Sequence, residues 1–128
     1  MQNGHITYAD RSLFSERFRI FDGNDYVYWQ GRMRIRLQAI SVELWEIVEN
    51  GYTIPHPETP TPEDEANIRL NAQAKDIIYD SISRDIFIQF RHLDTAKQIW
   101  DALENVHEIQ MARTDAHIDM LRAMFAHF

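Results

Sequence analysis

Apolar residues recur at intervals of three and four along most of the chain, which is the spacing of one face of an α-helix. The first series follows the turn-like segment 22–25 and continues for over six turns. Ser41 can be either a bend or a new N-cap, so this region is one helix of about 25 residues or two shorter ones. Asn50-Gly51 is typical of a left-handed helix end. The apolar positions are Tyr26, Trp29, Met33, Leu37, Ile40, Leu44, Trp45 and Ile47 or Val48.

The second half of the chain carries clear helix-start signals. Thr61-Pro62-Glu63-Asp64 combines an N-cap, a proline at the first helical position and an acidic first turn, and predicts a helix that ends near Asp80. Ser83 predicts a short helix, and Thr95 with Gln98 fits a capping box. That capping box opens a helix whose apolar stripe reaches residue 106, and a last helix carries the apolar residues of 111–128. Nothing alternates like a strand, so the prediction is an all-α fold, a single compact bundle of five to six helices.

Two segments do not follow the helical pattern. Residues 1–20 keep neither a period of 2 nor one of 3.6, and we expect an irregular N-terminal arm that lies over a domain formed by residues 21–128. The segment 52–62 holds all four prolines. Because proline removes an amide donor and favours extended geometry in its predecessor, we expect a stiff exposed loop there.

Size and composition fit one soluble domain. The chain has 128 residues, of which 45% are apolar, and contains no cysteine. The absence of cysteine excludes disulfides, thiolate metal sites and cysteine nucleophiles. No apolar run approaches the roughly 20 residues needed to cross a bilayer, and the first residues lack the features of a secretory signal. We therefore expect no membrane partner and a cytoplasmic location, with the nucleus as an alternative.

The charge distribution bears on nucleic-acid binding. The net charge is −7, yet residues 1–40 carry six arginines against four acids. A net-acidic domain attracts phosphate backbones poorly, because binding needs clustered cations. RNA is a possible but disfavoured partner, and the alternative is a solvated face with arginine stems covering apolar surface. The candidate contacts of such a weak RNA-binding module are Arg17, Arg19, Arg32, Arg34 and Arg36.

The sequence holds no recognisable catalytic or metal-binding motif. None of the six histidines forms a helical i, i+4 pair with another, and the four glycines form neither a dinucleotide-binding pattern nor a P-loop. The G-x-S-x-G signature of serine hydrolases does not occur either. We therefore name no catalytic residue, no metal ligand and no cofactor, and expect that the protein is not an enzyme.

Four short blocks occur in one order along roughly residues 18–108. The first follows F-x-G-x-x-Y-x-x-W-x-x-x-M-x-x-x-L, and the second, residues 44–52, is close to LW-x-VVENGY. The third comprises Ala74-Lys75, Ile77-Ile78 and 81–83, and the fourth, residues 95–104, is close to TAKEIWD-x-LE. Together the blocks resemble the Gag polypeptide of copia-type LTR retrotransposons, which are abundant in plant genomes. The motif residues expected in the core are Phe21, Gly23, Tyr26, Trp29, Met33, Leu37, Leu44, Trp45, Gly51, Ile99, Trp100 and Leu103.

The resemblance implies a helical, capsid-like domain that self-associates into a shell around element RNA. The family usually continues into further helices and a Cys-Cys-His-Cys zinc knuckle that contacts RNA. This chain has no cysteine, so we expect the nucleic-acid-binding part to be absent. The sequence fits either a truncated Gag or a host protein derived from Gag that kept only the assembly fold.

The resulting hypothesis is a non-enzymatic protein–protein assembly module that forms a dimer or a larger shell-like assembly. Its physical basis is the last helix, which has more apolar residues than one narrow stripe needs. The alternatives are an intramolecular core, a Gag-derived host module that binds a cellular or viral protein, and the weak RNA-binding module. The candidate self-association residues are Met111, Ile118, Met120, Leu121, Met124, Phe125 and Phe128.

Overall fold

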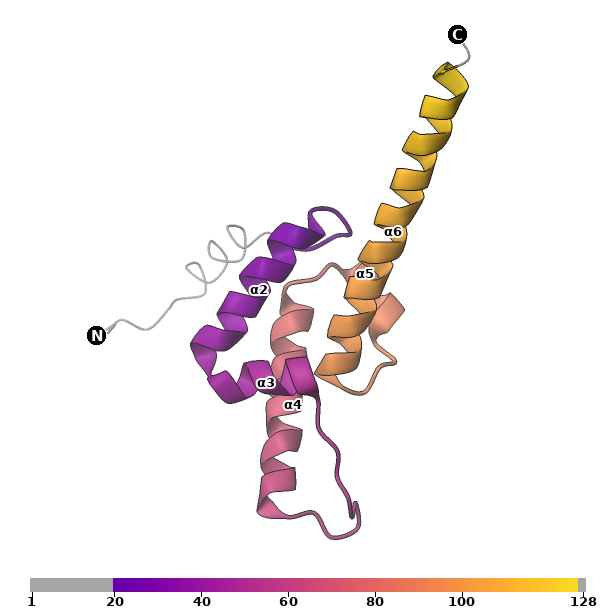
Figure 1. Ribbon diagram of the computed structural model, residues 1–128. Coiled ribbons are helices and arrows are strands. Elements are labelled where there is room, and N and C mark those ends of the chain that lie inside the picture. Colours follow the sequence, from indigo (N-terminus) through magenta and orange to yellow (C-terminus); the bar gives the residue numbers. More distant parts are fainter. Residues whose placement is uncertain (1–19, 127–128) are drawn as a thin grey trace, which may run out of the picture.

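The computed structural model describes residues 20–126, and this part of the chain is all-α (Figure 1). Arg17, Arg19, Phe128 and nearly all of the expected N-terminal arm lie outside the described residues. The described helices, labelled as in Figure 1, are α2 (Tyr26–Ile40), α3 (Val42–Asn50), α4 (Pro62–Asp80), α5 (Arg84–Phe90) and α6 (Ala96–Phe125).

Capping residues decide where the helices begin and end. Ser41 separates α2 from α3, and its hydroxyl accepts a hydrogen bond from the Leu44 amide at 3.0 Å. Thr61 and Asp64 form a reciprocal capping box at the start of α4. Gly51 ends α3 with φ 71° and ψ −165°, a combination that essentially only glycine adopts. The long apolar region after residue 25 is therefore two helices.

The C-terminal region differs from the prediction of two helices. α6 is a single helix of 30 residues from Ala96 to Phe125. The segment 107–111 breaks the apolar stripe but contains neither proline nor glycine, so nothing in it ends a helix. At 1.5 Å per residue, α6 is about 45 Å long.

The core lies between α2, α3, α4 and the first turns of α6. Trp29, Trp45 and Trp100 meet there, with Trp100 5.7 Å from Trp29 and 5.3 Å from Trp45 between ring centroids. Of the twelve motif residues named above, the two glycines are half-buried and the other ten are buried.

A polar contact and a short backbone bridge close one end of the core. Phe21 pairs with Ile82 in a parallel bridge, with the Phe21 amide 2.8 Å from the Ser81 carbonyl. The buried Trp29 Nε1 donates to Ser81 Oγ at 2.9 Å. The segment before α2 is thus fastened to the segment between α4 and α5.

Asn71 of α4 anchors the start of α6. Its Oδ1 accepts from the buried Ala96 amide at 2.8 Å, and its Nδ2 donates to the Asp94 carbonyl at 3.3 Å. Thr95 and Gln98 complete a capping box at the same helix end. Three of the backbone N–H groups at the start of α6, those of Thr95, Ala96 and Gln98, therefore have side-chain partners, one of them from another helix.

Two parts of the molecule extend away from the core (Figure 1). The proline-containing loop between α3 and α4 projects together with the N-terminal half of α4, and most of its residues are exposed. On the other side, the C-terminal half of α6 continues beyond the other helices. The second of these carries the candidate functional surface.

Candidate functional site

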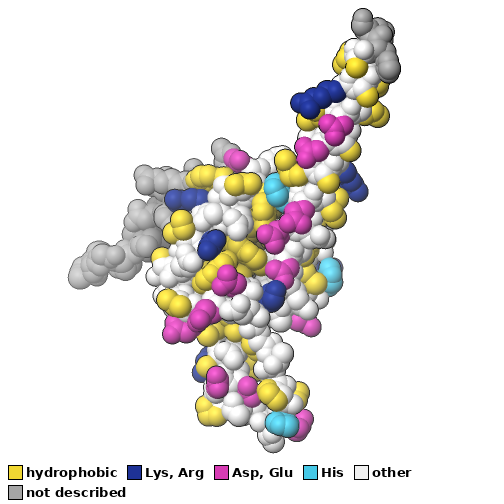
Figure 2. All heavy atoms as spheres, viewed as in Figure 1, with side chains coloured by type: hydrophobic (Ala, Val, Ile, Leu, Met, Phe, Trp, Pro, Cys, Tyr) yellow, Lys and Arg dark blue, Asp and Glu magenta, His cyan; other side chains and the backbone are white. Residues whose placement is uncertain are grey.

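The projecting half of α6 carries exposed apolar side chains along its whole length. From residue 108 to residue 126 every side chain is exposed except that of Leu121, which is half-buried. Met111 is 48% exposed and Ile118 is 40% exposed. Apolar side chains alternate with charged ones along this arm (Figure 2). A helix with this composition and no cover is unusual for a monomer.

Six residues of α6 form a narrow stripe that we call the seam. They follow one another at intervals of four and three residues, which is the heptad spacing of a coiled-coil contact. At about 100° per residue, the seam lies on the same side of α6 as Ala96, Trp100 and Leu103. These three residues are buried against the part of the molecule formed by α2, α3, α4 and α5, which we call the body. The core-facing side of the helix thus continues without rotation into the projecting half. The seam consists of His107, Met111, Thr114, Ile118, Leu121 and Phe125.

The candidate self-association residues do not all share this side. Met111, Ile118, Leu121 and Phe125 belong to the seam, whereas Met120 lies roughly opposite. Met120 and Met124 are 53% and 54% exposed. The two methionines therefore belong to a different face of α6, which they share with exposed Val106 and Ile109.

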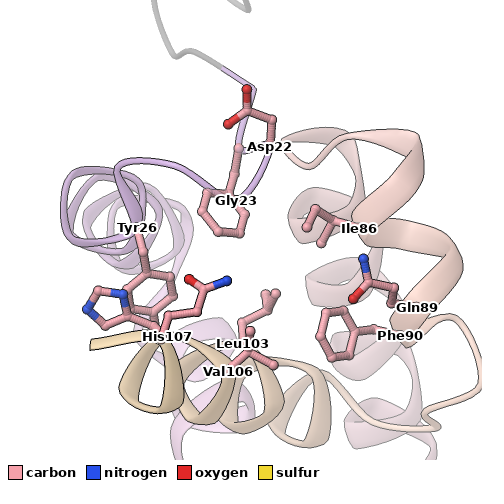
Figure 3. Close-up of a pocket in the computed structure, with 11 residues that line it drawn as sticks. Asp22, Gly23, Tyr26, Ile86, Gln89, Phe90, Leu103, Val106 and His107 are labelled. Carbon is pink, nitrogen blue, oxygen red and sulfur yellow. The ribbon is translucent and has the colours of Figure 1, made fainter. Parts of the chain in front are cut away.

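A hollow of about 220 Å³ lies beside α6 at the point where the helix leaves the body. Figure 3 shows Ile86, Gln89 and Phe90 of α5 facing Tyr26 and His107 across this opening. Small-molecule sites are usually larger, about 300 Å³ or more. A space of roughly 150 Å³ already accepts a benzene ring. The hollow therefore has the size of one aromatic side chain. Its α6 lining is Leu103, Val106, His107 and Gln110.

Tyr26 joins the hollow to the seam. Its ring stacks on that of His107 with 4.5 Å between centroids. Burial raises the pKa of the Tyr26 phenol well above its ordinary value, and the nearby carboxylates of Glu104, Glu108 and Asp101 add to the effect. The buried Tyr26 hydroxyl has no hydrogen-bond partner among the described residues. His107 is the first residue of the seam and also lines the hollow, so the stack with Tyr26 lies where the two features meet.

Three of the five candidate RNA-contacting arginines lie within the described residues. Arg32 and Arg34 are exposed on α2, and Arg36 is half-buried. The Arg34 guanidinium lies 5.4 Å from the centre of the Trp45 ring, so its charge already interacts with the protein. This contact places the Arg34 guanidinium beside Trp45 of α3.

The described residues hold no group of three or more side chains that could bind a metal ion. None of the helices within residues 20–126 is long and apolar enough to cross a membrane. The polar groups around the hollow are Asp22, Gln89, His107 and Gln110 together with the buried phenol of Tyr26. His107 stacks on the Tyr26 ring. Among these described groups, no hydrogen bond joins a nucleophile to a base.

Sequence reasoning did not find all the residues of this surface. His107 and Thr114 belong to the seam but are polar, so a search for apolar residues passed over them. The heptad spacing through Met111 and Ile118 is the signal that identifies them. The hollow had no such signal, because its walls come from three separate parts of the chain.

Comparison with known proteins identifies one family. A family model described as the gag-polypeptide of LTR copia-type matches residues 33–125, well over half of the chain. The match begins within α2 and ends at the last residue of α6, so it includes the whole seam. No curated protein and no solved structure matches the chain.

Proposed function

Because the chain belongs to the gag-polypeptide family of LTR copia-type elements, we propose that it is an assembly module that associates with copies of itself through the seam of α6. Membership of this family favours a structural role over an enzymatic one. The proposal assigns the seam to a second copy of this chain and gives no catalytic role to the hollow.

The observation that carries this proposal is the continuity of the core-facing side of α6 into an exposed half. In the body this side is covered by α3 and α4, which pack against α6. In the projecting half the same side carries Met111, Ile118 and Leu121 at heptad spacing, with no other helix of the described structure beside it. A second seam provides the matching cover, since identical stripes at heptad spacing can interlock.

The free energy available from the seam sets the strength of the association. Full burial of a Leu, Ile or Met side chain contributes about 1.5–3 kcal/mol. These side chains are already partly covered by their own helix, so about 1 kcal/mol each is a reasonable gain. Association itself costs about 4 kcal/mol or more. With four apolar seam side chains in each copy, Phe125 included, the net gain is about 4 kcal/mol, which corresponds to a dissociation constant of about 1 mM. The assay therefore has to reach that concentration.

The test is light scattering after size-exclusion chromatography, on nucleic-acid-free protein from about 1 µM to 1 mM. The wild-type chain is expected to shift from monomer to dimer or larger species. Ile118→Glu places a charge in the middle of the seam and is expected to keep the chain monomeric. Ala116→Glu adds the same charge on the opposite side of the same helix turn and serves as the matched control.

Two results would contradict the proposal. A wild-type chain that remains monomeric at all concentrations would show that the seam does not bind a second copy, and would favour the alternative of a different protein as partner. Equal effects of Ile118→Glu and Ala116→Glu would show that self-association uses another surface. Circular dichroism at 222 nm confirms that both variants remain helical.

A further inference from the structure

We propose that the two copies pair antiparallel, and that each hollow beside α6 receives the partner's Phe125. This inference rests on the proposed function and adds the geometry of the complex. It follows from three features of the structure: the position of the body relative to the seam, the charges beside the seam, and the place and size of the hollow.

The body excludes a parallel pair. The seam lies on the side of α6 that the body covers from Ala96 to Leu103. In a parallel pair, the first turns of the second α6 would have to occupy the space already filled by the first body. In an antiparallel pair, the partner helix runs towards the body and can stop where the body begins. The distance from His107 to Phe125 is about 27 Å of helix, so the two bodies lie at opposite ends of the pair.

One antiparallel register matches the two seams over their full length. It places Met111 against the partner's Leu121 and Thr114 against the partner's Ile118, and symmetry repeats both layers. His107 then lies against the partner's Phe125 at each end. All six seam positions find a seam position opposite, and none is left over.

Charges beside the seam favour this register. In antiparallel coiled coils, the flanking positions on one side of the seam face each other. Glu108 then faces the partner's Arg122, and this opposite-charge pair occurs twice. In a parallel pair Arg122 would instead face the partner's His117. In the monomer Arg122 is highly exposed and only 4.0 Å from Asp119, so it can exchange this weak contact for the new one.

Other flanking charges near the twofold axis contribute differently. On one side of the seam, Asp115 faces the partner's Asp115 across the twofold axis. On the other side, His117 faces the partner's His117. The Asp115 pair is a like-charge contact, which opposes association. The variant Asp115→Asn is therefore expected to tighten an antiparallel dimer, whereas in a parallel one Asp115 would face the uncharged Gln110 and the change would have little effect.

The hollow lies where the antiparallel partner helix ends. His107 belongs both to the seam and to the wall of the hollow, so a side chain opposite His107 is next to the opening. Phe125 is 69% exposed. Its phenyl ring fits a space of about 220 Å³ lined by Val106, Ile86 and Phe90. Aromatic side chains that enter such recesses are typical anchors of protein interfaces.

The absence of cysteine makes the orientation directly testable. Met111→Cys and Leu121→Cys chains are prepared separately, mixed and oxidised, and the disulfide-linked species are identified by mass spectrometry. The antiparallel pair brings residue 111 of one copy to residue 121 of the other, within disulfide reach. The expected product is the mixed dimer, with little linkage in either variant alone.

The outcomes separate this inference from the proposed function. Disulfide-linked dimers of each variant alone, without preference for the mixed product, would establish a parallel pair and overturn the antiparallel geometry while leaving self-association intact. A monomeric wild-type chain in light scattering would overturn both. The charge-reversal variants Glu108→Arg and Arg122→Glu give an independent readout: each alone is expected to weaken the dimer about threefold to tenfold, and the double variant to restore it. Failure of the double variant to recover would contradict the register.

The position of Phe125 in the partner's hollow is tested by two truncations on opposite sides of α6. Phe125→Ala is expected to raise the dissociation constant about tenfold or more. Met120→Ala removes an apolar side chain that is 53% exposed on roughly the opposite side of α6, where this register places no contact with the partner, and is expected to change the dissociation constant less than twofold. Equal effects of the two truncations would show that the hollow does not hold the partner's Phe125.

Discussion

The anchoring of α6 by Asn71 offers the sharpest test of the structure itself. Asn71→Ala removes the side-chain oxygen that accepts from the fully buried Ala96 amide at 2.8 Å. A buried donor left without a partner costs about 1–3 kcal/mol. The second hydrogen bond of Asn71, to the Asp94 carbonyl at 3.3 Å, is longer and adds less. We therefore expect the free energy of unfolding to fall by about 1–3 kcal/mol.

The measurement is urea denaturation followed by circular dichroism at 222 nm, with Thr95→Ala as the comparison. Thr95 caps the same helix, but its hydroxyl accepts from the Gln98 amide at an exposed position. Water can replace that contact, so Thr95→Ala is expected to cost about 1 kcal/mol, the typical value for an N-cap. Hydrogen exchange of the Ala96 amide should become faster in Asn71→Ala, because this variant removes the acceptor of that amide.

The reasoning fails if Asn71→Ala changes the free energy of unfolding by less than about 0.5 kcal/mol. That result would mean that water reaches the Ala96 amide and that α4 does not fix the start of α6. A cost for Thr95→Ala larger than that for Asn71→Ala would likewise contradict the assignment, because it would place the main capping contact on the exposed side of the helix end.

Two further predictions concern Gly51 and Tyr26. Gly51→Ala is expected to lower the free energy of unfolding by about 1–3 kcal/mol, measured in urea, because a side chain is strained at φ 71° and ψ −165°; a cost near zero would show that the backbone relaxes. The folded state raises the pKa of Tyr26 above the ordinary value of 10.0, so above about pH 10 the unfolded chain binds fewer protons and stability falls as the pH rises. Tyr26→Phe is expected to weaken this alkaline loss and to keep or raise stability at pH 7, since the buried hydroxyl has no partner among the described residues. Thermal unfolding at pH 7 and pH 11 checks this, with exposed Tyr28→Phe as the control; an unchanged alkaline loss in Tyr26→Phe would contradict it.

The helices were predictable where a local signal marks them. Ser41, Thr61, Ser83 and Thr95 all accept hydrogen bonds from the first turn of the helix that follows, as their positions in the sequence predicted. Asp25 is different, because it precedes α2 with φ 63° and makes no side-chain cap. Residues near a turn compete for the capping role, and the sequence does not decide among them.

Contacts between distant residues were not predictable in this way. Asn71 looks like any polar residue on an amphipathic helix, yet it is buried and binds the start of α6, 25 positions away. Trp29 and Ser81 are 52 positions apart and share a buried hydrogen bond. Such pairs depend on how the helices pack, which a single sequence does not encode as a pattern. The same holds for the hollow, which forms only when α5 and the segment before α2 meet α6.

The seam shows how a structure changes the meaning of a periodic pattern. In the sequence, Trp100 and Leu103 are followed by a stretch with few apolar residues, and the pattern resumes at Met111. The weak stretch predicted a break between two helices, the second of which could have folded back to complete the core. The continuous α6 carries this second part away from the core instead, so its apolar side has no cover from the described helices. Because α6 continues without a break, the side that packs against the core between Ala96 and Leu103 becomes an exposed apolar side beyond it. This continuity is the basis of the proposed antiparallel pair.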